Sequence, residues 1–258
     1  CIPGKNNVIA MSPSYGMYEV AANINDIEIR KVLLNDDFSL DAESILKSTD
    51  KNTRLVFLCS PNNPTANMIQ NESVFYLLDN FNGLVVVDEA YIDFAGSNGV
   101  LPYITDYENL VVLRTFSKAW GLAGIRLGMA FADQEVIRVL SRIKYPYNVN
   151  ALTQEFASKF LSKKDLRNRW VREIKKQRKI LVNELAELGI CEKIYPSDAN
   201  FVLVKVKDAL KIYEYLKDQK LIIRDRSKVR LCEGCLRVTV GKSTENKRLI
   251  QLLKEYTG

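Results

Sequence analysis

The sequence contains no histidine, and its five cysteines have no regular spacing. Only Cys232 and Cys235 form a Cys-x-x-Cys pair, an arrangement found in redox sites and in half of a zinc site. A structural zinc site needs four ligands, and without histidine or a second such pair this chain lacks the other two. We therefore expect two reduced thiols in a turn and no metal site.

Long apolar runs and signal-peptide features are also missing, so we expect a cytoplasmic protein without a membrane-spanning segment. Charge of one sign is not concentrated either, because the lysines and arginines behind the net charge of +6 are spread along the chain. The densest basic run, residues 163–179, has apolar residues at helical spacing. That spacing indicates a solvated helix face rather than a nucleic-acid-binding patch.

The order of the predicted elements indicates an α/β fold. The 258 residues are 47% hydrophobic, which is enough for one large domain and a smaller one. Strand-like apolar runs alternate with helical segments at first, and a mix of strands and helices typical of an α+β layer follows residues 148–150. We predict a large domain over residues 1–150 and a small domain over 151–258. The chain opens on a helix end and a turn, so we expect further residues before Cys1.

Three apolar runs in the first half are typical of strands buried on both faces. They cover residues 54–59, 84–87 and 110–113. The first leads into a turn of two prolines and two asparagines, the second ends at Asp88, and the third is followed by Lys118. Prolines and asparagines are ordinary turn residues, but open α/β sheets bind ligands at the carboxyl ends of their strands. These strand ends are therefore the candidate site.

Asp88 stands at the end of a buried strand, where a carboxylate is costly unless it has a partner. A pyridinium nitrogen would be a suitable partner, since each charge would hold the other in its ionised form. A protonated pyridine ring is an electron sink for carbanion chemistry, and Tyr91 could hydrogen-bond the ring oxygen. The rival interpretation is a magnesium-binding aspartate, but the phosphate loop Gly-x-x-x-x-Gly-Lys-Ser/Thr is absent.

Lys118 has neighbours suited to a phosphorylated aldehyde cofactor. Thr115 and Ser117 offer hydroxyl groups, and Arg126 offers a planar fork that matches a phosphate. The lysine would form a Schiff base with the aldehyde while the other three grip the phosphate. Taken alone, however, a lysine in a Ser-Lys pair is more often an ordinary solvated loop lysine.

Two further side chains are candidate binding residues because of where they lie in the predicted strands and turns. Tyr15 lies in the turn after a strand, where its ring could stack on a flat cofactor or simply pack on the following helix. Arg237 lies in the apolar strand predicted at residues 235–240, which we expect to pair with a strand at 221–224. Alternation places Arg237 and Thr239 on the face opposite the apolar side chains. It is either an exposed arginine on an edge strand or a clamp for a carboxylate.

In their order along the chain, these motifs resemble the fold-type I pyridoxal-phosphate aminotransferases. The motifs are SPNNPT at 60–65, DEAY at 88–91 and SK at 117–118, with Arg126 downstream. Within that group, PSYGMY at 13–18 and LRVTVG at 236–241 are similar to the histidinol-phosphate aminotransferases. The similarity extends along essentially the whole chain. It implies a mostly parallel central sheet flanked by helices, with a smaller C-terminal α+β domain.

The resemblance also implies a role for each matching residue. Lys118 would carry the Schiff base with pyridoxal 5'-phosphate, and Asp88 would pair with the pyridine nitrogen. Asn63 and Tyr91 would contact the ring hydroxyl, and Tyr15 would stack on the ring. The phosphate would be held by Ser117 and Arg126.

The implied substrates are histidinol phosphate and glutamate or 2-oxoglutarate, and the implied assembly is a homodimer. Arg237 would bind the α-carboxylate of glutamate, and Arg224 would meet the phosphate of the other substrate. A threonine-phosphate decarboxylase would use nearly the same lysine, aspartate and arginines. A non-catalytic remnant that serves as a binding or scaffold protein is a third interpretation.

The chain departs from the family pattern at two points. The asparagine-proline turn of the family continues with glycine, where this sequence has Ala66 after Thr65. An N-terminal stretch that helps to cradle the cofactor phosphate, and that supplies tyrosines to the substrate, has no counterpart in these residues.

Overall fold

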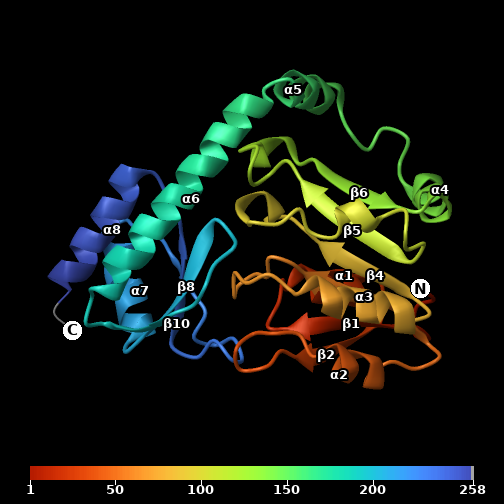
Figure 1. Ribbon diagram of the computed structural model, residues 1–258, viewed down its shortest axis with the longest axis horizontal. Coiled ribbons are helices and arrows are strands. Elements are labelled where there is room, and N and C mark those ends of the chain that lie inside the picture. Colours follow the sequence, from red (N-terminus) through yellow and green to blue (C-terminus); the bar gives the residue numbers. More distant parts are fainter. Residues whose placement is uncertain (257–258) are drawn as a thin grey trace.

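The computed structural model describes residues 1–256. Two β-sheets lie at opposite ends of the molecule, and the long helix α6 (Lys164–Ala186) extends from one towards the other (Figure 1). The larger sheet has six strands in the order β2-β1-β3-β4-β5-β6, and the smaller has four in the order β7-β8-β10-β9. The α/β class and the mostly parallel central sheet are confirmed. The division at residue 150 stays a prediction.

The larger sheet is parallel except at β6, which runs antiparallel to β5. Its strands are β1 (Asn7–Ser12), β2 (Glu28–Leu33), β3 (Thr53–Cys59), β4 (Leu84–Asp88), β5 (Leu110–Thr115) and β6 (Gly128–Ala132). The three predicted apolar runs became β3, β4 and β5 at the centre, where Val56, Val85 and Val112 are fully buried. Strands apolar on both faces require cover on both faces.

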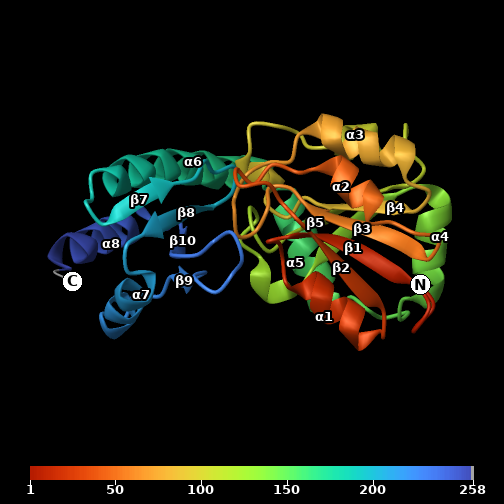
Figure 2. The same cartoon turned by 90° about the horizontal axis from the view of Figure 1, so that it is seen from below.

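Helices provide that cover. On one face lie α2 (Ala42–Lys47) and α3 (Asn71–Asn80), while α1 (Met17–Ile24) lies on the other (Figure 2). The start of α2 is fixed by Asp41, whose side chain accepts a hydrogen bond of 2.9 Å from the backbone N–H of Ser44. The side chains of Leu77 and Ile45 are fully buried against the sheet. These helices bury the central strands and leave the strand ends accessible.

The strand order reverses between β1 and β3, because β1 pairs with β2 on one side and β3 on the other. Such a switch point opens a crevice at the carboxyl ends of the strands. The turns after β1, β3, β4 and β5 all lie along this edge. The fold therefore brings four separate sequence segments to one place.

The smaller sheet is antiparallel. It consists of β7 (Cys191–Ile194), β8 (Phe201–Val206), β9 (Arg224–Asp225) and β10 (Cys235–Thr239), with helices α7 (Ala209–Asp218) and α8 (Ser243–Glu255) beside it. Val204 and Val238 point into a core that α6 closes with Leu181 and Leu185. Arg237 projects from β10 on the other face, as alternation predicts.

The strand expected at residues 221–224 begins only at Arg224, so the prediction is wrong for Leu221 to Ile223. Leu221 is held at the end of α7, because its N–H donates a hydrogen bond to the carbonyl of Leu216. Ile222 is exposed to solvent. After two paired residues the chain turns again, because Asp225 accepts hydrogen bonds from the backbone and hydroxyl of Ser227. Capping and turn bonds thus outcompete strand propensity here.

Six elements were not predicted from the sequence. They are β6, β7, α4 (Gln134–Ile143) and the short 3-10 helices η1 (Ile92–Phe94), η2 (Leu101–Tyr103) and η3 (Ala123–Ile125). Cys232 and Cys235 are free, buried thiols; Cys232 lies in the loop before β10, and Cys235 is the first residue of that strand, so the predicted turn does not include it. None of the helices within residues 1–256 is both long and apolar enough to span a bilayer.

Candidate active site

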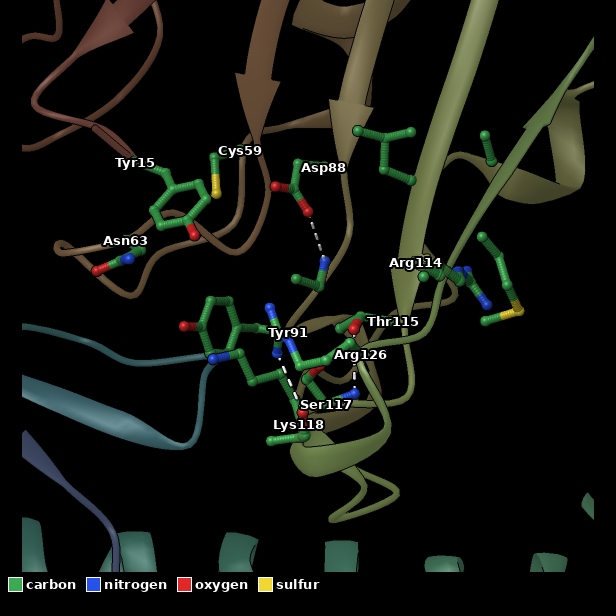
Figure 3. Close-up of a pocket in the computed structure, with 16 residues that line it drawn as sticks. Tyr15, Cys59, Asn63, Asp88, Tyr91, Arg114, Thr115, Ser117, Lys118 and Arg126 are labelled. Atoms are coloured by element: carbon green, nitrogen blue, oxygen red, sulfur yellow. Dashed lines mark hydrogen bonds between the residues drawn. The ribbon is translucent and has the colours of Figure 1, made fainter. Parts of the chain in front are cut away.

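The turns at the carboxyl edge of the large sheet surround a cavity of about 580 Å³ (Figure 3). Seven residues named from the sequence line it: Tyr15, Asn63, Asp88, Tyr91, Ser117, Lys118 and Arg126. Thr115 lines it as well. The cavity therefore gathers residues that are more than one hundred positions apart in the chain.

Lys118 lies in the loop after β5, and the Thr115 side chain accepts a hydrogen bond of 3.0 Å from the Ser117 N–H in that loop. The Lys118 Nζ atom is 5.0 Å from the centre of the Tyr91 ring. Burial lowers the pKa of Lys118, and the positive charge of Arg237 lowers it further. A lysine with a lowered pKa supplies more neutral amine at neutral pH, which is the nucleophilic and basic form.

Asp88 is the last residue of β4, and both of its carboxylate oxygens have donors. Oδ1 accepts a hydrogen bond of 3.0 Å from the N–H of Ala90, and Oδ2 accepts one of 2.8 Å from the hydroxyl of Tyr18. Burial raises the pKa of Asp88, while these two hydrogen bonds and the charge of Lys118 oppose the shift. The carboxylate is therefore poised for a cationic partner within the cavity.

Arg126 closes the short 3-10 turn η3 (Ala123–Ile125) with a positive φ of 54°. Its Nη1 donates a hydrogen bond of 3.0 Å to the carbonyl of Ala123, and the rest of the guanidinium is open to a ligand. Ser117 and Thr115 border the same cavity. One guanidinium and two hydroxyl groups form a donor set that matches a phosphate.

Asn63 links the large sheet to the small one. Its side-chain oxygen accepts a hydrogen bond of 2.6 Å from Nη1 of Arg237, and that guanidinium packs 4.8 Å from the centre of the Phe201 ring. Within residues 1–256, the buried Nε of Arg237 has no hydrogen-bond partner. The guanidinium thus retains donor capacity beside the cavity. Tyr15, on the opposite side, is 43% exposed and free to accept a flat ligand.

Neither Arg237 nor Arg224 is among the residues that line the cavity. Arg224 is exposed on β9, directly across from Arg237 in the antiparallel register. Directly opposite residues of an antiparallel pair project to the same face. The two arginines therefore share one face of the small sheet, with Arg237 nearer to the cavity.

The sequence reading missed Tyr18, Cys59 and Arg114. Tyr18 lies in the first turn of α1, three residues beyond Tyr15 in the preceding turn, and the two rings meet edge-on at 5.6 Å. Cys59 ends β3 directly beside Asp88, so the parallel register could have found it. Arg114 pairs at 2.7 Å with Glu89, whose carboxylate is 1% exposed, and this ion pair ties the end of β5 to the DEAY motif.

Ala66, where the family pattern has glycine, adopts a φ of 69° and is fully buried. This left-handed conformation favours glycine, since the Cβ of other residues strains it by about 1–2 kcal/mol. The alanine methyl packs with Tyr91 and Phe94 in return. Alanine therefore keeps the turn and adds an apolar contact beneath the site.

The comparisons with known proteins agree with this geometry. The family model for aminotransferase class I and II matches residues 1–253. Histidinol-phosphate aminotransferase of Cytophaga hutchinsonii is 51% identical over 256 residues, which cover 99% of this chain and 74% of that protein.

Solved structures are similar too. The histidinol-phosphate aminotransferase of Clostridium acetobutylicum has a TM-score of 0.91 at 24% identity, over 97% of this chain and 77% of that one. The Sinorhizobium meliloti enzyme, solved in complex with pyridoxal-5'-phosphate, has a TM-score of 0.85 at 25% identity, over 97% and 71%. The chain belongs to the class I and II aminotransferases and, within them, to the histidinol-phosphate aminotransferase family.

Proposed function

We propose that this protein transfers an amino group between histidinol phosphate and 2-oxoglutarate, with pyridoxal phosphate as its cofactor. The observation that carries the proposal is one cavity bordered by both a lysine of lowered pKa and a half-buried aspartate. Those two groups are what an amino transfer through an aldehyde cofactor requires. The products would be glutamate and imidazole-acetol phosphate.

The donor set of the cavity fits pyridoxal phosphate. Lys118 offers an amine for the aldehyde, Asp88 a carboxylate for the ring nitrogen, and Arg126 a guanidinium for the phosphate. A volume of about 580 Å³ is in the usual range for small-molecule sites, about 300–1,000 Å³. Partial burial raises the pKa of Asp88, while its hydrogen-bond donors favour the anion; a cationic ring nitrogen would further stabilise that anion.

Each of these side chains would have its own role in binding the cofactor or in moving a proton. When bound, pyridoxal phosphate supplies an aldehyde that takes up the amino group and a ring that withdraws electrons. Lys118 would hold the cofactor and, once released, would move a proton to and from the substrate's α-carbon through Nζ. Asp88 would keep a proton on the ring nitrogen, and Asn63 and Tyr91 would bind the ring hydroxyl. Tyr15 would cover the ring, and Ser117 and Arg126 would hold the phosphate.

The test of the proposed function is a direct product assay. Given histidinol phosphate and 2-oxoglutarate, the purified protein should form glutamate, because Lys118 lines the cavity and Arg237 and Arg224 on the small sheet offer guanidinium groups to the two anionic substrates. In parallel, threonine phosphate should release no carbon dioxide. Carbon dioxide without glutamate would instead make the protein a decarboxylase, and neither product would favour the non-catalytic interpretation.

The two arginines should separate the two substrates. Arg237→Ala should slow the half-reaction with glutamate, because the α-carboxylate loses the guanidinium that binds it. Arg224→Ala should slow the half-reaction with histidinol phosphate more than the half-reaction with glutamate. Charge-assisted hydrogen bonds contribute about 1.5–3 kcal/mol each, so each loss should be at least tenfold. Single-turnover absorbance changes of the cofactor measure each half-reaction separately.

Arg230→Ala is the matched control, because Arg230 is an exposed arginine of the same β9–β10 segment. It should leave both half-reactions unchanged. Equal losses in both half-reactions for Arg224→Ala, or no loss in either, would remove Arg224 from phosphate binding.

We further propose that the protein acts in the cytoplasm as a homodimer. Support for self-association comes from large apolar side chains between residues 139 and 156 that are exposed to solvent. They include Ile143, Tyr145, Tyr147, Leu152 and Phe156, with Tyr147 94% exposed. A surface this apolar is typical of an interface. Light scattering should give twice the chain mass, and a monomer at micromolar concentration would contradict the proposal.

A further inference from the structure

Tyr18 is a buried titratable group that the mechanism above does not use. It lies on α1 with 8% of its surface exposed, and its ring stacks on Phe57 at 5.0 Å with an interplanar angle of 10°. Tyr15 meets it edge-on at 5.6 Å. Held on two sides by aromatic rings, the Tyr18 hydroxyl has a fixed position 2.8 Å from Oδ2 of Asp88.

The surroundings leave that hydroxyl only one function, as a donor. Burial, followed by the nearby Cys59 and Asp88, raises the pKa of Tyr18 far above its ordinary value, so the phenol keeps its proton. Cys59 directs its own thiol towards the carbonyl of Pro61 at 3.5 Å. The Tyr18 proton is therefore directed to Asp88, which is the acceptor of this pair.

The other groups around Asp88 act differently. The Ala90 N–H holds Oδ1, and Lys118 acts through its charge. The Cys59 thiol and Tyr91 hydroxyl both have raised pKa values and remain neutral at neutral pH. Tyr18 is thus the one side chain that hydrogen-bonds the Asp88 carboxylate among residues 1–256.

We propose that Tyr18 is a positioning residue for the reaction, which orients the Asp88 carboxylate and keeps it ionised for the cofactor's ring nitrogen. The proposal rests on the proposed function, because it assigns Tyr18 a task only if Asp88 pairs with that nitrogen. A hydrogen bond donated to the anion offsets the burial that favours the neutral acid. Without it, Asp88 would hold its proton to a higher pH and would fail to pair with a protonated ring.

The experiment compares Tyr18→Phe with Tyr107→Phe. Phenylalanine keeps the stack on Phe57 and removes only the hydroxyl, and Tyr107 is a matched control because it stacks on Phe75 at 5.7 Å, away from the cavity. Two readouts apply: the dissociation constant of pyridoxal phosphate from absorbance titration, and the pH dependence of the glutamate half-reaction.

For Tyr18→Phe we expect about tenfold weaker cofactor binding, since a lost hydrogen bond to a charged group corresponds to at least that factor. We also expect the acid limb of the pH profile to move to higher pH, so that raising the pH restores part of the rate. Tyr107→Phe should match the wild type in both readouts. A loss for Tyr18→Phe that is equal at every pH would overturn the proposal.

A double variant separates this proposal from the role of Asp88. If Tyr18 acts through Asp88, adding Tyr18→Phe to Asp88→Asn should cost little more than Asp88→Asn alone. Independent, multiplying losses would overturn the Tyr18 proposal. If Asp88→Asn alone is unimpaired, the assignment of Asp88 fails, whereas an impaired Asp88→Asn with a normal Tyr18→Phe overturns only the role of Tyr18.

Discussion

Asp88→Asn is expected to lower the rate of amino transfer by at least two powers of ten, which is about 2.7 kcal/mol of transition-state free energy. Asparagine has the shape of aspartate but no charge, so the ring nitrogen would lose the anion that keeps it protonated. The Ala90 N–H would still donate to the amide oxygen, and the Tyr18 hydroxyl would accept from the amide NH2 group that replaces Oδ2. The loss would therefore report the charge and not the fold.

The measurement is the rate of each half-reaction with saturating pyridoxal phosphate, together with the amount of cofactor bound. Asp36→Asn serves as the control, because Asp36 is an exposed aspartate in the turn that follows β2. Near-normal turnover of Asp88→Asn with the cofactor bound would remove Asp88 from the role assigned to it.

Lys118→Ala is expected to reduce the rate by about 10²–10⁴-fold, the range in which a positioned acid–base group contributes. The alanine removes both the attachment point and the proton carrier, while Ser117 and Arg126 still border the cavity. A small primary amine added to the buffer should restore part of the rate, because it can move the proton in the space that the side chain leaves.

Lys144→Ala is the control for Lys118, since Lys144 is an exposed lysine in the loop after α4. The wild-type rate should also depend on pH in a defined sense. With a pKa lowered by burial and by Arg237, the Lys118 amine is available at a lower pH than that of a free lysine side chain. A rate that rises only near the ordinary pKa of lysine would contradict this environment.

Much of the site could be predicted because strand ends are visible in a sequence. Val85–Val87 and Leu110–Leu113 are apolar without alternation, a pattern that fits only strands buried on both faces. Once the strands are parallel, their carboxyl ends meet, so Asp88 and Lys118 had to lie near one another. The resemblance added the order of the motifs and therefore the cofactor. The identity to the Cytophaga hutchinsonii protein then favours the aminotransferase over the decarboxylase.

The rest depends on contacts between distant segments. The hydrogen bond from Tyr18 to Asp88 spans 70 positions, and that from Arg237 to Asn63 spans 174. No local pattern encodes either one. The short β9 and the exposure of Arg224 follow from turn bonds around Asp225, which override the strand propensity of the preceding apolar residues.

The most direct test of the central assignment is to find which lysine carries the cofactor. The protein is saturated with pyridoxal phosphate, reduced with borohydride, digested and mapped by mass spectrometry. We expect the pyridoxyl label on Lys118, the lysine that lines the cavity with Asp88 and Arg126. A label on Lys144 or any other lysine, with Lys118 unmodified, would contradict the account.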